Sequence, residues 1–175
     1  MLQIRKAKDE DSDFGQVCEL IGQLDREFFD LSKTKVKDPK EAGLSRQLYT
    51  SWIQKTSCSC WISHKEELVV GFMRLECWDY PEDRLYSDKK YLKISEIVVH
   101  QDWRNKKELK VGESLFNHAV SIAREKNRDG IEVGTLGNAL ARGFYEHMFA
   151  KLTGGEKHPK EIEEINFKCP FSLIR

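Results

Sequence analysis

Four basic side chains gather just before a predicted helix in the middle of the chain. They are Arg104, Lys106, Lys107 and Lys110. The first N–H groups of a helix have no partner within it, and its macrodipole is positive at that end. Cations beside such N–H groups, next to Gly112, suit a phosphate or pyrophosphate. The alternative is a solvated basic turn that only joins two core elements.

A buried strand is predicted immediately before this turn. The run from Ile94 to Val99 is rich in β-branched residues and is interrupted only by Ser95 and Glu96. A carboxylate inside such a strand is unfavourable unless it is solvated, paired or used in chemistry. Glu96 is therefore a candidate base, and the alternative is a glutamate that faces solvent or pairs with Lys93 or a neighbouring strand.

The helix after the turn has one apolar face. Its apolar residues recur at helical spacing and are Leu115, Phe116, Ala119, Ile122 and Ala123. The strand, the basic turn and the helix therefore form one unit that would present the turn to a ligand.

This unit resembles the central motif of the GNAT N-acetyltransferase superfamily, which is roughly L-x-V-x-P-x-x-R-G-x-G-x-G/A-x-x-L. The matching residues are Ile97, Val99, Arg104, Gly112 and Leu115. The chain departs from the motif at Gln101, which replaces the proline, and at Asn105, which replaces the first glycine. Three extra residues also separate Arg104 from Gly112. Counted back from Gly112 instead, Lys107 takes the basic position and Lys110 that of the middle glycine.

A second stretch resembles the family's N-x-x-A-x-x-x-Y-E motif. The matching residues are Asn138, Ala141, Tyr145 and Glu146, and the Gly-Phe pair usual after this helix is replaced by Phe149-Ala150. In the family the asparagine contacts the cofactor and the tyrosine protonates the leaving thiolate. The alternatives are Asn138 as a helix N-cap and Tyr145 as a core aromatic residue.

The resemblance implies an N-acetyltransferase that moves an acetyl group from acetyl-CoA to a primary amine of an unidentified small molecule or protein. The expected fold is α/β (α+β), with a mixed, mostly antiparallel central sheet flanked by helices, the acyl-CoA N-acyltransferase fold. Tyr145 would be the acid and Glu96 the base, and no metal is expected. The cofactor-binding residues would be Ile97, Val98, Val99, Arg104, Lys107, Lys110, Val111, Gly112, Glu113, Ser114, Asn138 and Tyr145.

Two other classes of protein stay open. A non-catalytic CoA-binding, sensing or degenerate GNAT module is favoured by Lys110, which stands where the family has glycine. A pure protein-interaction domain would not need the Asn138 and Tyr145 pair. Acetyl-CoA, but not AMP, should stabilise an acetyltransferase or a CoA-binding module against heat, and should not stabilise an interaction domain.

Composition sets the broad class. The chain has 175 residues, of which 39% are hydrophobic, so we expect a single domain over residues 1–175. The 29 basic and 29 acidic residues cancel, and no apolar run approaches the ~20 residues of a spanning helix, so no nucleic acid or membrane is expected as a partner. Five cysteines without a signal-peptide core predict reduced thiols in the cytoplasm. We leave a homodimer open.

The remaining elements follow from periodicity and turn residues. We expect strands at Leu2–Lys8, Cys58–His64, Leu68–Trp78, Gly130–Thr135 and Ile165–Ile174, and helices from about Asp11, Pro39 and Asn138. The Pro39–Lys55 helix should bury Leu44, Leu48 and Trp52. Cys58 and Cys60 should point to one face of their strand as buried structural residues rather than metal ligands.

Overall fold

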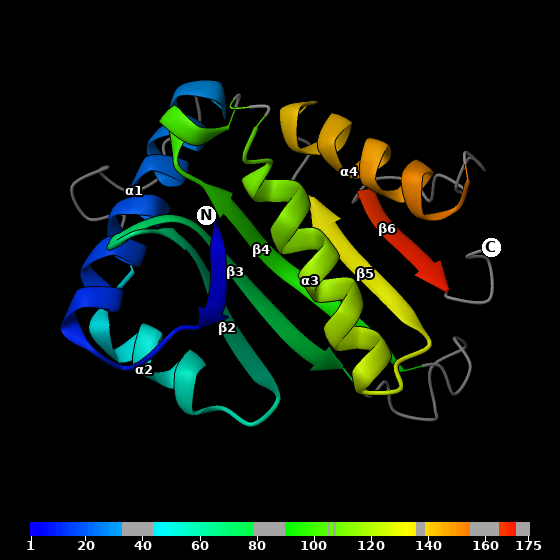
Figure 1. Cartoon of the computed structure of the whole chain (residues 1–175), viewed down its shortest axis with the longest axis horizontal. Coiled ribbons are helices and arrows are strands. Elements are labelled where there is room, and N and C mark those ends of the chain that lie inside the picture. The colour runs from blue at the N-terminus through cyan, green and yellow to red at the C-terminus, as the bar shows by residue number, and fades with distance from the viewer. Residues whose placement is uncertain are drawn as a thin grey trace. The chain divides into compact units, whose positions relative to one another are not determined.

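The computed structural model describes residues 1–32, 44–78, 90–104, 106, 108–135, 139–154 and 165–170 (Figure 1). The elements in chain order are β1 (Gln3–Lys6), α1 (Asp11–Ser32), α2 (Arg46–Gln54), β2 (Cys58–Lys65), β3 (Leu68–Trp78), β4 (Tyr91–Val99), the 3₁₀ helix η1 (Gln101–Trp103), α3 (Val111–Glu125), β5 (Gly130–Thr135), α4 (Ala139–Leu152) and β6 (Ile165–Pro170).

The strands are hydrogen-bonded in the order β1-β2-β3-β4-β5-β6. Strands β4 and β5 pair in parallel, whereas β1 pairs with β2, and β5 with β6, in antiparallel fashion. The two-residue turn Glu66–Glu67 makes β2 and β3 antiparallel as well, since a parallel pair needs a longer crossover. The predicted mixed, mostly antiparallel sheet with flanking helices is confirmed.

Contacts divide the chain into two compact units. The first comprises Met1–Arg74 and Glu96–Leu115, and the second comprises Leu75–Ser95 and Phe116–Arg175. Strands β3 and β4 and helix α3 therefore each contribute residues to both units.

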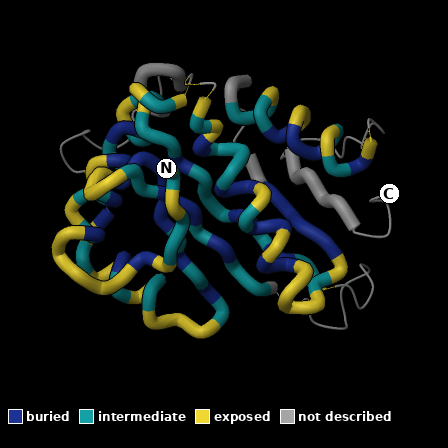
Figure 2. Tube along the Cα trace, in the orientation of Figure 1, coloured by how far each residue is buried: buried dark blue, intermediate teal, exposed yellow. Residues whose placement is uncertain are grey.

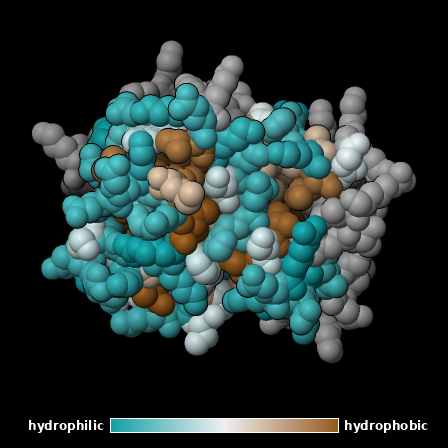
Figure 3. All heavy atoms as spheres, viewed as in Figure 1, coloured by the Kyte–Doolittle hydropathy of each residue, from teal (hydrophilic) through white to brown (hydrophobic). Residues whose placement is uncertain are grey.

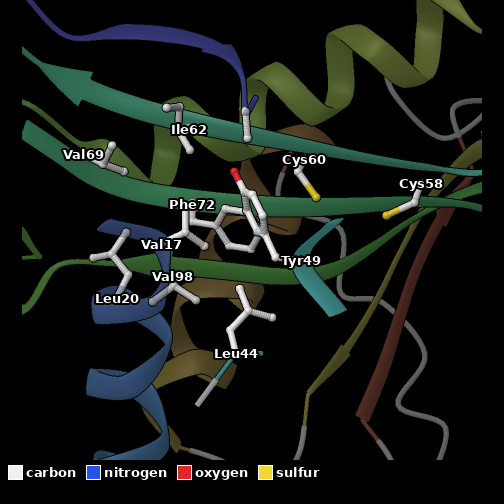
Figure 4. Packing of buried hydrophobic residues seen from close by; sticks show 11 residues of the cluster. Val17, Leu20, Leu44, Tyr49, Cys58, Cys60, Ile62, Val69, Phe72 and Val98 are labelled. Atoms are coloured by element: carbon white, nitrogen blue, oxygen red, sulfur yellow. The ribbon is translucent and has the colours of Figure 1, made fainter. Parts of the chain in front are cut away.

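In the first unit, α1 and α2 pack on one face of the strands. Figure 4 shows Val17 and Leu20 of α1 and Tyr49 of α2 gathered with apolar residues of β2, β3 and β4. The strand residues of this cluster are Cys58, Cys60, Ile62, Val69, Phe72 and Val98. The buried phenol of Tyr49 donates a 2.8 Å hydrogen bond to the carbonyl of Lys8, so its polar end is satisfied.

The prediction for the buried face of α2 is wrong at one residue. Leu48 is 45% exposed, whereas Tyr49 is fully buried. The helix begins at Arg46, and the side chain of its N-cap Ser45 accepts a hydrogen bond from the Leu48 N–H. This start places Tyr49, and Trp52 three residues later, toward the cluster. The predicted helical residues from Pro39 to Gly43 lie outside the described residues.

The second unit is organised by an aromatic cluster between α3 and α4. Phe116 of α3 lies 5.5 Å from Phe149 and 6.4 Å from Tyr145, measured between ring centroids. The edge contact between Phe116 and Phe149 adds stabilisation beyond that from the apolar area that the rings bury. Most of strand β5 is dark blue, and so buried, in Figure 2. Its Ile131 and Val133 are 0% exposed.

The surface is mainly polar on the face seen in Figure 3, where hydrophobic atoms form small separate groups. Among the described residues, the exposed large hydrophobic side chains are Met1, Leu48 and Leu68. No helix in the described part of the chain has the length and apolarity needed to cross a membrane.

Candidate functional site

The last residues of β4 lead directly into the basic turn. Val98 is buried in the first unit's apolar cluster, whereas Ile97 and Val99 are half-buried. The N–H of His100 donates to the carbonyl of Val70 at 3.0 Å, so β3 holds β4 up to its end. The three residues predicted to lie along the cofactor's arm therefore have a fixed backbone.

Arg104 ties this turn to two other elements. Its Nε donates to the carbonyl of Val99 at 2.8 Å, and its Nη1 lies 2.6 Å from the carboxylate of Glu27 on α1. These bonds occupy the guanidinium within the protein. The structure thus gives Arg104 the contacts of a residue that holds the shape of the turn.

The basic residues of the turn have different surroundings. The ammonium of Lys106 lies 4.1 Å from the centroid of a Trp103 ring, and that of Lys65 lies 5.3 Å from it. Such cation–π contacts contribute ~0.5–1 kcal/mol at exposed sites. Lys110 is exposed, with its ammonium 3.4 Å from the carboxylate of Glu113. Lys107 lies outside the described residues.

The start of α3 has backbone N–H groups without a partner inside the helix. The N–H of Ser114 donates to the carbonyl of Lys110 at 2.9 Å, which is the first bond of the helix. The N–H groups of Val111 and Gly112 come before that bond and have no acceptor one turn earlier within the helix. Val111 is 1% exposed, whereas Gly112 is half-buried. This end of α3 therefore suits an anion electrostatically.

Lys110 has a backbone conformation that favours glycine. Its φ is +42°, in the left-handed region. Counting the GNAT motif back from Gly112 places the middle glycine at Lys110. In that alignment, the glycine position of the motif coincides with a backbone conformation that favours glycine.

Glu96 has a charged partner on a neighbouring strand. Nε and Nη2 of Arg74 lie 3.2 Å and 3.3 Å from the two carboxylate oxygens, and the same guanidinium lies 4.5 Å from a Trp52 ring. Pairing with a neighbouring strand was one of the two predicted alternatives. The pair accounts for a carboxylate in an apolar strand without requiring a catalytic role.

The cysteine pair on β2 is buried in the first unit. Cys58 and Cys60 are 9% and 3% exposed. The hydrogen bond with Cys58, together with burial, raises the pKa of the Cys60 thiol, which therefore stays protonated. Among the described residues, no group of three His, Cys, Asp or Glu side chains could hold a metal ion.

In the second unit, Tyr145 is 7% exposed and packs against Phe116 and Phe144. Its ring is therefore held by aromatic neighbours on α3 and α4. Glu146, the last residue of the second motif, forms a 2.8 Å ion pair with Arg142 one turn earlier. Asn138 lies outside the described residues.

Three residues near the candidate site were not selected from the sequence. Arg74 pairs with Glu96, Trp52 lies against the Arg74 guanidinium, and Gly71 of β3 lies beside the start of α3. A charge at Arg74 within the mostly apolar β3 was the available signal for an ion pair. A glycine inside a strand, such as Gly71, was the signal for a close approach.

The comparison of sequences decides the family. A sequence model of the family described as "Acetyltransferase (GNAT) domain" matches residues 56–148, more than half of the chain. The chain belongs to the GNAT acetyltransferase family. The match includes the strand, the basic turn and α3, and also Tyr145 of this GNAT protein. No curated protein sequence matches it.

Solved structures share the fold of this GNAT protein at low sequence identity. A tetramutant of the BH1408 protein from Bacillus halodurans superposes with a TM-score of 0.77 at 18% identity, covering 92% of this chain and 97% of that chain. A ribosomal-protein-alanine N-acetyltransferase from Brucella melitensis biovar Abortus 2308 has a TM-score of 0.60 at 16% identity, covering 83% and 89%. An aminoglycoside acetyltransferase from an uncultured soil metagenomic sample, in complex with sisomicin, has a TM-score of 0.59 at 14% identity, covering 93% and 94%.

Proposed function

We propose that this protein is an N-acetyltransferase that transfers the acetyl group of acetyl-CoA to a primary amine. The observation that carries the proposal is the start of α3 in a chain of the GNAT family. There, a left-handed Lys110 leads into a helix whose first N–H groups have no acceptor within it, which supports a pyrophosphate at this end. Acetyl-CoA would supply the acetyl group as an activated thioester.

The residues around α3 would bind the phosphates. The N–H groups from Val111 to Glu113, which come before the first bond of the helix, would donate to the pyrophosphate, and Gly112 would leave space for it. Lys107 and Lys110 would add positive charge, whereas Arg104 would hold the turn through its bonds to β4 and α1. The backbone of Ile97–Val99 would bind the pantetheine arm, and Asn138 would add a further contact.

Two side chains are proposed for proton transfer. Tyr145 would donate a proton to the departing thiolate, since a phenol of ordinary pKa ~10 is protonated at neutral pH. Glu96 is the candidate base for the ammonium of the acceptor, and its ion pair with Arg74 supports the alternative structural role. Placing both reactants side by side would supply a large part of the rate.

An amine is the acceptor that fits the relatives of this fold. The Brucella structure is named as an N-acetyltransferase acting on alanine of a ribosomal protein, and the metagenomic one as an aminoglycoside acetyltransferase. These names differ in the acceptor, as expected for a fold that serves many acceptors. We propose a cytoplasmic enzyme whose partners are acetyl-CoA and the amine, without nucleic acid, membrane or metal.

Binding of acetyl-CoA is the experiment that tests the proposal. Acetyl-CoA at ~100 times its dissociation constant should stabilise the protein by ~2.7 kcal/mol, and AMP should not. Gly112→Asp places a negative side chain where the phosphates would lie and should weaken the binding measured by calorimetry at least about tenfold.

Gly15→Asp is the matched control, because Gly15 is also near a helix start, is exposed and would have no neighbouring atom within 4 Å of an added Cβ. It should bind acetyl-CoA like wild type. If the Gly112→Asp variant binds acetyl-CoA as tightly as wild type does, the phosphates do not bind at the start of α3. Binding without turnover for any amine would favour the non-catalytic CoA-binding alternative.

A further inference from the structure

Gly71 of β3 lies in contact with the start of α3. A Cβ atom at this position would lie 2.8 Å from Cγ1 of Val111 and 3.0 Å from Cδ1 of Leu115. It would also lie 3.4 Å from the carbonyl oxygen of Val98. Val111 and Leu115 are the apolar residues of the first turn of α3, and they are 1% and 0% exposed. The first turn of the helix therefore rests on the bare backbone of β3.

The contact lies on the face of β3 opposite the cluster of α1 and α2. A Cβ on Gly71 would meet Val111 and Leu115, so Gly71 faces α3, whereas the next residue, Phe72, belongs to that cluster. The atom of closest approach belongs to Val111, and a valine side chain has little freedom at χ1, so this neighbour does not yield readily by rotation.

We propose that Gly71 is a positioning residue for the cofactor site. Its missing side chain lets the first turn of α3 lie close enough to β3 to aim the N–H groups of Val111 and Gly112 at the phosphates. This inference rests on the proposed function. An alanine would push the helix start away by about half an ångström, and displacements of ~1 Å at such sites cost up to ~10²-fold.

Gly71→Ala tests the inference, with CoA as the probe in calorimetry. We expect the dissociation constant of CoA to rise about tenfold or more, and the KM for acetyl-CoA to rise with it. The kcat at saturating acetyl-CoA should change much less, since the substitution touches no reacting group. Gly22→Ala is the matched control, because its Cβ would meet only the tip of the Arg26 side chain, at 3.5 Å.

Rescue distinguishes positioning from general damage to the fold. Val111→Ala removes the atom of closest approach, so the double variant Gly71→Ala/Val111→Ala should bind CoA within about threefold of wild type. Val111→Ala alone should lose stability through its cavity, and its own CoA affinity is the reference for the rescue. A weakened Gly71→Ala protein that the second substitution does not restore would contradict the inference.

If Gly71→Ala does not fold, Val111→Ile enlarges the other side of the same contact and should also weaken CoA binding. A folded Val111→Ile protein with wild-type affinity would overturn the inference. Wild-type protein that binds no CoA would instead overturn the proposed function. Wild-type protein that binds CoA beside a folded Gly71→Ala variant that binds it equally would overturn only the role of Gly71.

Discussion

The Arg74 guanidinium is paired with the Glu96 carboxylate, with Nε 3.2 Å from one oxygen and Nη2 3.3 Å from the other. The two side chains are 17% and 29% exposed, so the pair is well shielded from water. It links β3 to β4 three residues before β4 ends, and the Trp52 ring of α2 lies against its guanidinium. The candidate base is therefore part of a structural ion pair in the first unit.

A double-mutant cycle measures this pair. Arg74→Met and Glu96→Gln should each lower the free energy of unfolding by about 1–3 kcal/mol, because the first removes the guanidinium and the second the negative charge of a shielded ion pair. The double variant should lose at least about 1 kcal/mol less than the sum of the two. Additive losses in urea unfolding would show that the two side chains do not interact.

The same variants separate the two roles of Glu96. If Glu96 is the base, Glu96→Gln should lower kcat far more than Arg74→Met does, with the affinity for acetyl-CoA unchanged. If the role is structural, both variants should lower kcat only in step with their stability.

The buried carboxylate of Asp13 should make part of the folding stability depend on pH. It is 1% exposed and accepts hydrogen bonds from Arg5 at 2.7 and 2.8 Å and from the Lys8 N–H at 2.9 Å. Burial alone would raise the pKa of Asp13, but the hydrogen bonds and the charge of Arg5 outweigh it and the pKa is lowered. The carboxylate therefore stabilises the fold above its ordinary pKa of ~3.9, and this contribution is lost as the pH falls through the lowered value.

Asp13→Asn should cost about 2–4 kcal/mol of unfolding free energy at pH 6. The difference from wild type should shrink as the pH falls below ~4. Asp11→Asn, at a fully exposed side chain of the same helix, is the control and should cost much less at pH 6. A difference for Asp13→Asn that stays constant from pH 6 to pH 3 would refute the assignment.

Periodicity correctly predicted the elements around the turn. The expected strand Ile94–Val99 lies within β4, and the five apolar residues predicted for the helix after the turn are all at most 4% exposed. Such a strand and such a helix face are set by residues close together in the sequence, so the hydrophobic periodicity reveals them. The exposed Leu48 was misassigned because the pattern alone does not show where α2 begins.

The partners of the site residues could not be predicted, because they come from distant parts of the chain. Arg104 pairs with Glu27, 77 positions away in the sequence, and Glu96 pairs with Arg74, 22 positions away. A sequence shows the charges but not which of them the fold brings together. The close approach of Gly71 to α3 likewise depends on packing in three dimensions.

The backbone of Lys110 should be strained, and a glycine at this position should relieve the strain. Because its φ is +42°, Lys110→Gly should be more stable than Lys110→Ala by about 1 kcal/mol, although both variants lose the same charge. Glu66, with φ of +58° in the β2–β3 turn, should show the same order of glycine above alanine. Equal unfolding free energies for the two Lys110 variants would exclude backbone strain there.

We expect residues 1–175 to unfold as one domain, since β3, β4 and α3 each contribute to both compact units. Three of the four tryptophans, Trp52, Trp61 and Trp103, lie in the first unit, so fluorescence mainly reports its unfolding. Far-UV circular dichroism reports both units. Coincident transitions in urea are expected, and a separate second transition by circular dichroism would show two domains.

Release of CoA thiol from acetyl-CoA, with and without amines, tests acetyl transfer most directly. We expect an amine to accelerate release by the wild-type protein. Tyr145→Phe should lower kcat about 10²-fold, because the phenol proton is lost while the ring keeps its packing on Phe116. Its melting temperature and acetyl-CoA affinity should remain near wild type. Full activity of the Phe variant would exclude Tyr145 as the acid, and wild-type protein that binds acetyl-CoA while no amine accelerates thiol release would contradict the proposal of an N-acetyltransferase.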